Sequence, residues 1–125
     1  MSFSWSDYLN VAEHLVEYSQ QSSYEEGCLR AAISRAYYAA LNTSRDLLQN
    51  QWGINVPTDA SIHKFIPQCF RDEDKPERKE IGMVLDRLRD RRRKADYSDE
   101  ISKPRSLARN SLADAQFVIE RLSTL

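Results

Sequence analysis

Arg92 is the residue whose position suggests the most chemistry, because helical spacing places its charge on an apolar face. Leu85 and Leu88 belong to a stripe with intervals of three and four residues, and the same spacing continues to Arg92 and Ala95. Burying an unpaired charge is very costly. Three interpretations stay open: an ion pair with Asp96 or with an acid of the first helix, a phosphate or other anion site, and a guanidinium that reaches solvent at the helix end.

Three further residues bear on this site. Arg35 lies among alanines on an expected helix, and if Arg35 and Arg92 face one cleft, that cleft is cationic and its ligand is an anion. Asp96 stands near a helix end where an acid opposes the helix dipole, so we expect a specific partner such as Arg92 or Arg35. Tyr97 could direct its hydroxyl into the cleft, although its ordinary pKa of about 10 makes it a poor base at neutral pH.

Other catalytic chemistry is sparse. His14 and His63 are the only histidines, and no histidines or cysteines show the spacing of metal ligands, so we expect no metal site and no cofactor. His63 and Lys64 stand at the start of an expected helix. The favoured interpretation of His63 is a surface histidine at a helix end. The alternative is proton transfer or contact with phosphate.

Charge is unevenly distributed along the 125 residues, which we expect to form one domain over residues 1–125. Residues 1–29 hold five acids and no Lys or Arg, whereas residues 81–94 hold six bases against two acids. The net charge of −1 therefore excludes a uniformly basic nucleic-acid binder but allows a local cationic surface. No apolar run is long enough for a membrane span, and no secretory signal precedes the helices, so we expect a cytoplasmic protein with reduced cysteines.

Apolar residues recur at helical intervals throughout, and no stretch alternates like a strand. The expected helices run from Ser4 or Ser6 to Ser19, from Ser23 to about Gln51, from near Ser61, from Pro76 to about Ala95, and from Pro104 to about Ser123. Ser23 with Glu26 has the pattern of a capping box, Gly53 is a plausible stop, and Pro67 is expected to interrupt or bend the third helix. The predicted fold is an all-α up-and-down antiparallel four-helix bundle with an additional short helix.

Three segments of the chain resemble one known family. Their sequences are Leu-Arg-Ala-Ala-Ile-Ser-Arg-Ala-Tyr-Tyr-Ala-Ala-Leu, Ser-Ile-His-Lys and Leu-Arg-Asp-Arg-Arg-Arg-Lys-Ala-Asp-Tyr, at residues 29–41, 61–64 and 88–97. In order and separation they resemble the HEPN domain, in its prokaryotic branch with a Ser-Arg-Ala-Tyr-Tyr-Ala helix and an Ala-Asp-Tyr ending. The likeness covers about residues 5–122.

This resemblance implies an all-α bundle that forms a homodimer with a cleft at the interface, and work directed at RNA. Many HEPN proteins are metal-independent endoribonucleases of toxin–antitoxin or defence systems, often encoded beside a nucleotidyltransferase that acts as the antitoxin. In the family mechanism an arginine holds the phosphate, and a histidine four to six residues later transfers protons as the ribose 2′-hydroxyl attacks. That requirement restricts the chemistry to RNA.

Carried over by position, the motif arginine is Arg92, and Tyr97 stands where the family has its histidine. The resemblance thus implies catalytic roles for Arg92, tentatively for Tyr97, and weakly for His63. The binding residues expected around them are Arg35, Tyr38, Lys64, Arg93 and Asp96. Three hypotheses remain open: an RNA- or nucleotide-binding module with a departed nuclease motif, an active endoribonuclease toxin, and a structural dimeric bundle.

Overall fold

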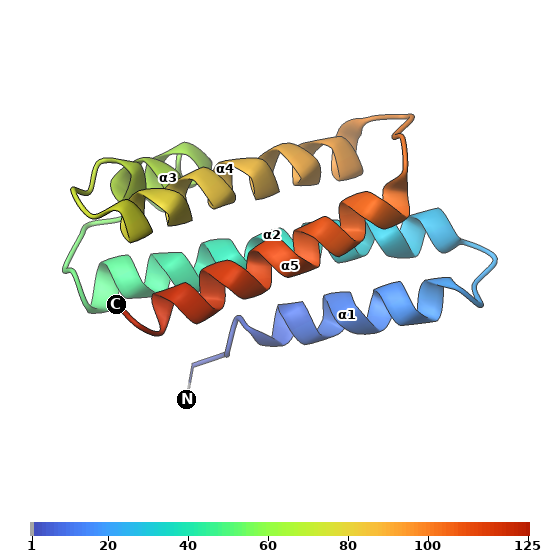
Figure 1. Cartoon of the computed structure of the whole chain (residues 1–125), viewed down its shortest axis with the longest axis horizontal. Helices are drawn as coiled ribbons and strands as arrows, with labels where there is room; N and C mark the ends of the chain where they lie inside the picture. Colours follow the sequence, from blue (N-terminus) through green and yellow to red (C-terminus); the bar gives the residue numbers. More distant parts are fainter. Residues whose placement is uncertain (1) are drawn as a thin grey trace.

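Five helices and no strand make up the regular structure of residues 2–125, which are the residues that the computed structural model describes. The helices are α1 (Asp7–Ser19), α2 (Glu25–Asn50), α3 (Ile62–Arg71), α4 (Pro76–Tyr97) and α5 (Pro104–Leu122). The four long helices run up and down along the long axis, and the short α3 lies beside α4 (Figure 1). The predicted all-α bundle with one additional short helix is therefore confirmed.

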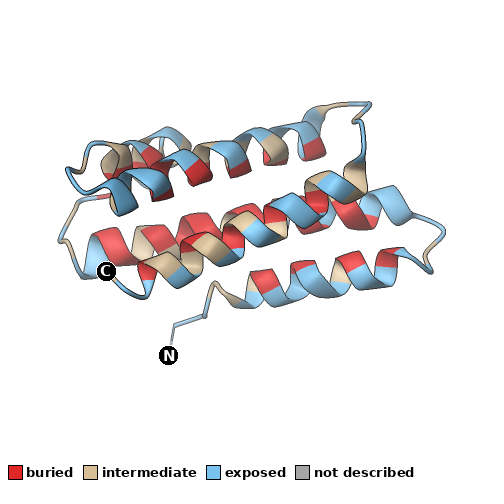
Figure 2. Ribbon diagram, in the orientation of Figure 1, coloured by how far each residue is buried: buried red, intermediate tan, exposed pale blue. Residues whose placement is uncertain are grey.

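Helix α2 forms the centre of the bundle, because it contacts each of the other four helices. Its small residues explain this position. Ala32, Ala36, Ala39 and Ala40 are fully buried, and side chains of this size let neighbouring helices approach closely. Tyr37 is also fully buried among them. Figure 2 shows buried residues on several sides of α2, whereas α1 buries one stripe and exposes the opposite face.

The ends of α2 test two sequence predictions. The capping box was wrong: α2 begins at Glu25, its N-cap is Tyr24, and no side chain caps it. The Ser22 hydroxyl instead accepts a hydrogen bond from the Tyr24 amide. The predicted stop is confirmed at the other end, where Gly53 adopts a left-handed φ of 63° and the chain leaves the helix.

Helices α3 and α4 approach each other closely at Gly82. A Cβ atom there would lie 2.6 Å from the carbonyl oxygen of Pro67 and 2.6 Å from Cγ of Arg71. Pro67 does not interrupt α3, which continues to Arg71. Because proline has no amide hydrogen, the carbonyl of His63 lacks its usual helical partner. The close contact at Gly82 fixes the position of α3, and therefore of His63, relative to α4.

None of the helices in residues 2–125 has the length and apolar character needed to cross a membrane. Over the same range, no three His, Cys, Asp or Glu side chains gather in a way that could hold a metal ion.

Candidate functional site

Arg92 faces into the bundle, as the helical spacing predicts, and is only 7% exposed. Its guanidinium carbon lies 5.3 Å from the ring centre of Tyr37, 5.6 Å from that of Tyr38 and 5.8 Å from that of Tyr97. We call these three rings the tyrosine box. Aromatic faces attract a cation, and this attraction offsets part of the cost of removing the guanidinium from water.

The negative charge near Arg92 is limited. The expected ion pair with Asp96 is present, but Nη1 and Oδ2 are 3.6 Å apart, and the same Asp96 oxygen also accepts a 3.4 Å hydrogen bond from Ser34. The Nε atoms of Arg92 and Arg89 are both buried without a hydrogen-bond partner. Burial alone would lower the pKa of Arg92, but the nearby tyrosines and Asp96 outweigh it, so the guanidinium stays charged.

His63 lies against the same tyrosines. Its Nδ1 is 2.6 Å from the hydroxyl oxygen of Tyr37, its ring stacks on Tyr37 at 5.6 Å, and its centre is 6.0 Å from that of Tyr38. The interpretation of His63 as a surface histidine is corrected here, because the ring is partly buried and hydrogen-bonded. Burial, and then the charges of Arg92 and Arg89, lower the pKa of His63 below its ordinary value of 6.5.

Tyr37 contacts both the arginine and the histidine of the site. One side chain contacts both Arg92 and His63, although the three residues come from α2, α4 and α3. Burial raises the pKa of Tyr37 well above its usual range, so its hydroxyl stays protonated at neutral pH. The residue therefore acts as a neutral hydrogen-bonding bridge between α2 and α3.

The exposed surface of α4 near Arg92 also carries positive charges, those of Arg93 and Lys94. Arg93 and Tyr97 are exposed and line a shallow hollow with Asp90, Lys94 and Ser98. Tyr97 belongs to both places, since its ring contacts Arg92 and also lines the hollow. Arg92 itself does not line it, so the buried arginine and the open surface meet at Tyr97.

Two predicted binding residues lie apart from the tyrosine box. The guanidinium of Arg35 lies 4.8 Å from the ring centre of Tyr8, on the side of α2 that faces α1. Lys64 is exposed at the start of α3, next to His63 in sequence. The structure thus brings Arg92, Tyr38, Asp96, Tyr97 and His63 together, and places Arg35 elsewhere.

Sequence reasoning missed two arginines. Arg89 lies one turn before Arg92 on α4, a spacing that could have placed it at this site. Arg30 was not singled out, although it fastens the end of α4: its guanidinium donates to the carbonyls of Ala95, Ser98 and Asp99 at 2.9, 2.6 and 3.2 Å. The Ala95 carbonyl is one that the end of α4 leaves without a helical partner, and the other two carbonyls belong to the segment that follows Tyr97.

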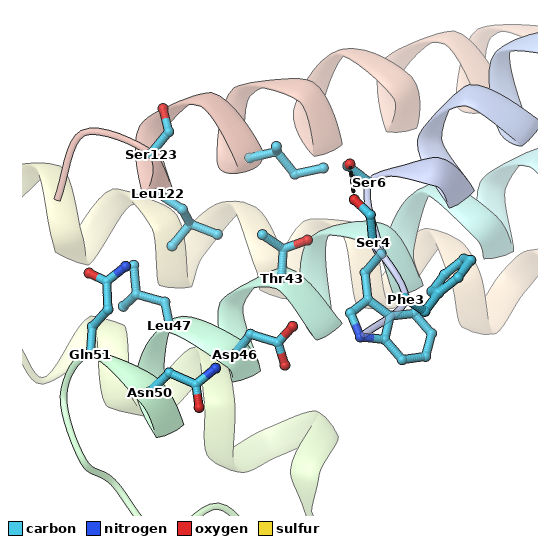
Figure 3. A pocket seen from close by; sticks show the side chains of 12 residues that line it. Phe3, Ser4, Ser6, Thr43, Asp46, Leu47, Asn50, Gln51, Leu122 and Ser123 are labelled. Carbon is cyan, nitrogen blue, oxygen red and sulfur yellow. Dashed lines mark hydrogen bonds between the residues drawn. The ribbon is translucent and has the colours of Figure 1, made fainter. Parts of the chain in front are cut away.

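A separate hollow of about 380 Å³ lies where the C-terminal parts of α2 and α5 meet the segment before α1 (Figure 3). Asp46 and Thr43 point into it from α2, and Ser4 and Ser6 close one side through a hydrogen bond. It contains none of the predicted site residues and no histidine. We therefore take the surroundings of Arg92 as the candidate site.

The protein is an up-and-down helical bundle. An arginine, a histidine and tyrosines gather between its helices α2, α3 and α4. Comparison with protein-family models identifies it further. The model of the HEPN domain matches residues 5–125, and the chain belongs to this family. The family assignment makes it a nucleotide- or RNA-related module of a kind that often dimerises. No curated protein matches the chain, and neither does any solved structure.

Proposed function

We propose that the chain is an RNA- or nucleotide-binding HEPN module that binds a phosphate group through the cationic surface around Arg92. The observation that carries the proposal is the buried guanidinium of Arg92, which has an unpaired Nε and only a 3.6 Å contact to a carboxylate. A phosphate oxygen is a charge-assisted acceptor for such donors. Around it, Arg89, Arg93 and Lys94 outnumber the nearby acids Asp90 and Asp96, which favours an anionic ligand.

The setting of this module is also part of the proposal. We infer a cytoplasmic homodimer of a toxin–antitoxin or defence system, with a nucleotidyltransferase antitoxin as the expected protein partner. The family supports this setting. Sedimentation velocity tests the dimer, because a species of 14.5 kDa at all micromolar concentrations would contradict it.

Binding measurements with tripolyphosphate, AMP and a short single-stranded RNA test the phosphate site. Arg92→Gln should weaken binding of all three ligands by roughly tenfold or more, because the phosphate of each ligand loses its charge-assisted hydrogen bonds to the guanidinium. The matched control is Arg109→Gln, which removes one exposed charge from α5. Equal affinities for the two variants, with both folded by circular dichroism, would overturn the site. No binding by the wild type would instead favour a structural dimeric bundle.

A second candidate function is metal-independent cleavage of RNA by Arg92 with Tyr97 and His63. The observation in its favour is the contact of His63 with Tyr37 beside Arg92. When Nδ1 donates to the Tyr37 hydroxyl, Nε2 is free to accept a proton from a ribose 2′-hydroxyl. The 2′-oxygen would then attack phosphorus to form a 2′,3′-cyclic phosphate, the bond from phosphorus to the 5′-oxygen would break, and the 5′-oxygen would take up a proton from water.

Digestion of an RNA pool in the presence of a chelator tests this activity. The wild type should cleave RNA but not RNA methylated at the 2′-oxygen, and His63→Gln and Arg92→Gln should each abolish cleavage. Tyr97→Phe distinguishes a role of the hydroxyl from a role of the ring. Absence of cleavage by the wild type removes this candidate and leaves the binding function in place.

A further inference from the structure

Tyr97 is the most exposed of the large apolar and aromatic residues in residues 2–125. It is 75% exposed at the last turn of α4, whereas the other exposed aromatic residues, Phe3, Tyr18 and Tyr24, are 40–62% exposed. Unlike each of those three, Tyr97 packs against no other aromatic ring among the described residues. The folded core therefore does not account for an aromatic side chain here.

The Tyr97 ring contacts the buried Arg92 and also borders an open hollow. Arg92 lies toward the bundle, with its guanidinium carbon 5.8 Å from the ring centre. Arg93 and Lys94 border the open hollow, because they stand four and three residues before Tyr97 on the same stretch of helix. Neither of these two forms an ion pair within residues 2–125. The ring is thus an exposed aromatic surface among available positive charges.

Hydrogen bonds also hold the backbone on both sides of Tyr97 in place. Arg30 fastens the end of α4 through the carbonyls of Ala95, Ser98 and Asp99, which flank Tyr97 in sequence. An aromatic group on a fixed helix end loses less freedom on binding than one on a loose segment. This arrangement suits a surface that receives a flat ligand.

We propose that Tyr97 stacks on a nucleobase of a single-stranded nucleic acid while Arg93 and Lys94 contact its phosphates. Aromatic side chains in a cationic groove bind single strands in this way, because every base has a face to stack. The bases of a duplex are already stacked and paired, so a duplex cannot supply one without a cost in free energy. The inference rests on the proposed function and adds to it the strandedness of the ligand and a role for Tyr97 through its ring.

Four probes separate the parts of this proposal: a short single-stranded RNA, its duplex, the same single strand made entirely of abasic nucleotides, and tripolyphosphate. Tyr97→Leu should weaken binding of the single strand about tenfold and should weaken tripolyphosphate binding by a clearly smaller factor. Tyr97→Phe should bind the single strand like the wild type, because it keeps the ring. The wild type should prefer the single strand over both the duplex and the abasic strand. Tyr24→Leu is the control for loss of an exposed tyrosine.

Other results would overturn the stacking role. If Tyr97→Phe loses as much affinity as Tyr97→Leu, the hydroxyl matters rather than the ring. If Tyr97→Leu weakens tripolyphosphate binding equally, or if the abasic strand or the duplex binds as well as the normal strand, no base stacks on Tyr97. Unchanged binding by Tyr97→Leu while Arg92→Gln is impaired removes the stacking inference alone. Unchanged RNA binding by Arg92→Gln contradicts the proposed function separately, and a wild type that binds no RNA overturns both.

Discussion

The hydroxyl oxygen of Tyr37 and Nδ1 of His63 lie 2.6 Å apart and join the centre of α2 to the first turn of α3. This contact brings a histidine to the tyrosine box, although 26 residues separate the two in the chain. A fully buried tyrosine thereby fixes the orientation of a ring that is partly open to solvent.

Removal of this hydroxyl should have a modest and specific effect. We expect Tyr37→Phe to lower the free energy of unfolding by about 1 kcal/mol, because one hydrogen bond is lost while the ring still packs. Tyr38→Phe is the matched control, since its hydroxyl makes no hydrogen bond within residues 2–125. Urea denaturation measures both, and equal stabilities of the two variants would argue against the contact.

The pKa of His63 gives a stability that depends on pH. Because burial, Arg92 and Arg89 depress this pKa in the folded state, the unfolded chain binds more protons as the pH falls below about 6.5. The wild type should therefore lose stability through this range, and His63→Gln should lose less. Urea denaturation at several pH values between 5 and 7.5 measures the difference. Parallel curves for the two proteins would contradict the shift.

The charge of Arg92 should be visible at the same histidine. Arg92→Gln removes a positive charge that lowers the pKa of His63, so the midpoint of the His63 titration should move to higher pH. Proton NMR measures this midpoint, with His63→Gln used to assign the resonance. Arg109→Gln, on the exposed face of α5, should leave it in place. A midpoint that stays or falls in Arg92→Gln would show that the two groups do not interact.

The contact between α3 and α4 should tolerate no side chain at Gly82. We expect Gly82→Ala to destabilise the protein by about 1–3 kcal/mol, because the new methyl group would meet backbone atoms of α3. Gly27→Ala is the matched control, since nothing lies within 4 Å of its added Cβ. Alanine favours a helix over glycine, so this control should be stabilised by up to about 1 kcal/mol. Thermal unfolding would contradict the close contact if both variants gained stability.

The arginine that fastens α4 should matter more than an exposed arginine beside the same helix end. Arg30→Met removes hydrogen bonds to three carbonyls and should cost about 1–3 kcal/mol. Arg93→Met is the comparison, because Arg93 is exposed and forms no ion pair within residues 2–125. Hydrogen exchange at the amides of residues 95–99 reports the local effect. Equal protection in the two variants would show that Arg30 does not hold this end.

The periodic parts of this fold could be predicted from the sequence. The inward position of Arg92 follows from the spacing of Leu85 and Leu88, which is a property of one helix. The helix starts at Pro76 and Pro104 were predicted correctly, because proline is favoured in the first turn. Each of these features depends on residues close together in the chain.

Features that depend on how the helices pack could not be predicted in this way. The meeting of His63 with Tyr37 depends on how tightly α3 lies on α4, which is set by Gly82 and the backbone of Pro67. Arg35 could not be placed from its alanine neighbours, because either side of α2 faces another helix. The capping box failed because the chain enters α2 through a bond between Ser22 and Tyr24.

The burial of Arg92 beneath aromatic rings has a consequence for ionic strength. Mobile ions screen exposed charges over about 8 Å at physiological salt, but they cannot surround a side chain that is 7% exposed. The attraction of Arg93 and Lys94 for an anion should therefore fade as salt is added, while that of Arg92 persists. The affinity for an anion that remains at high salt should therefore depend mainly on the charge of Arg92.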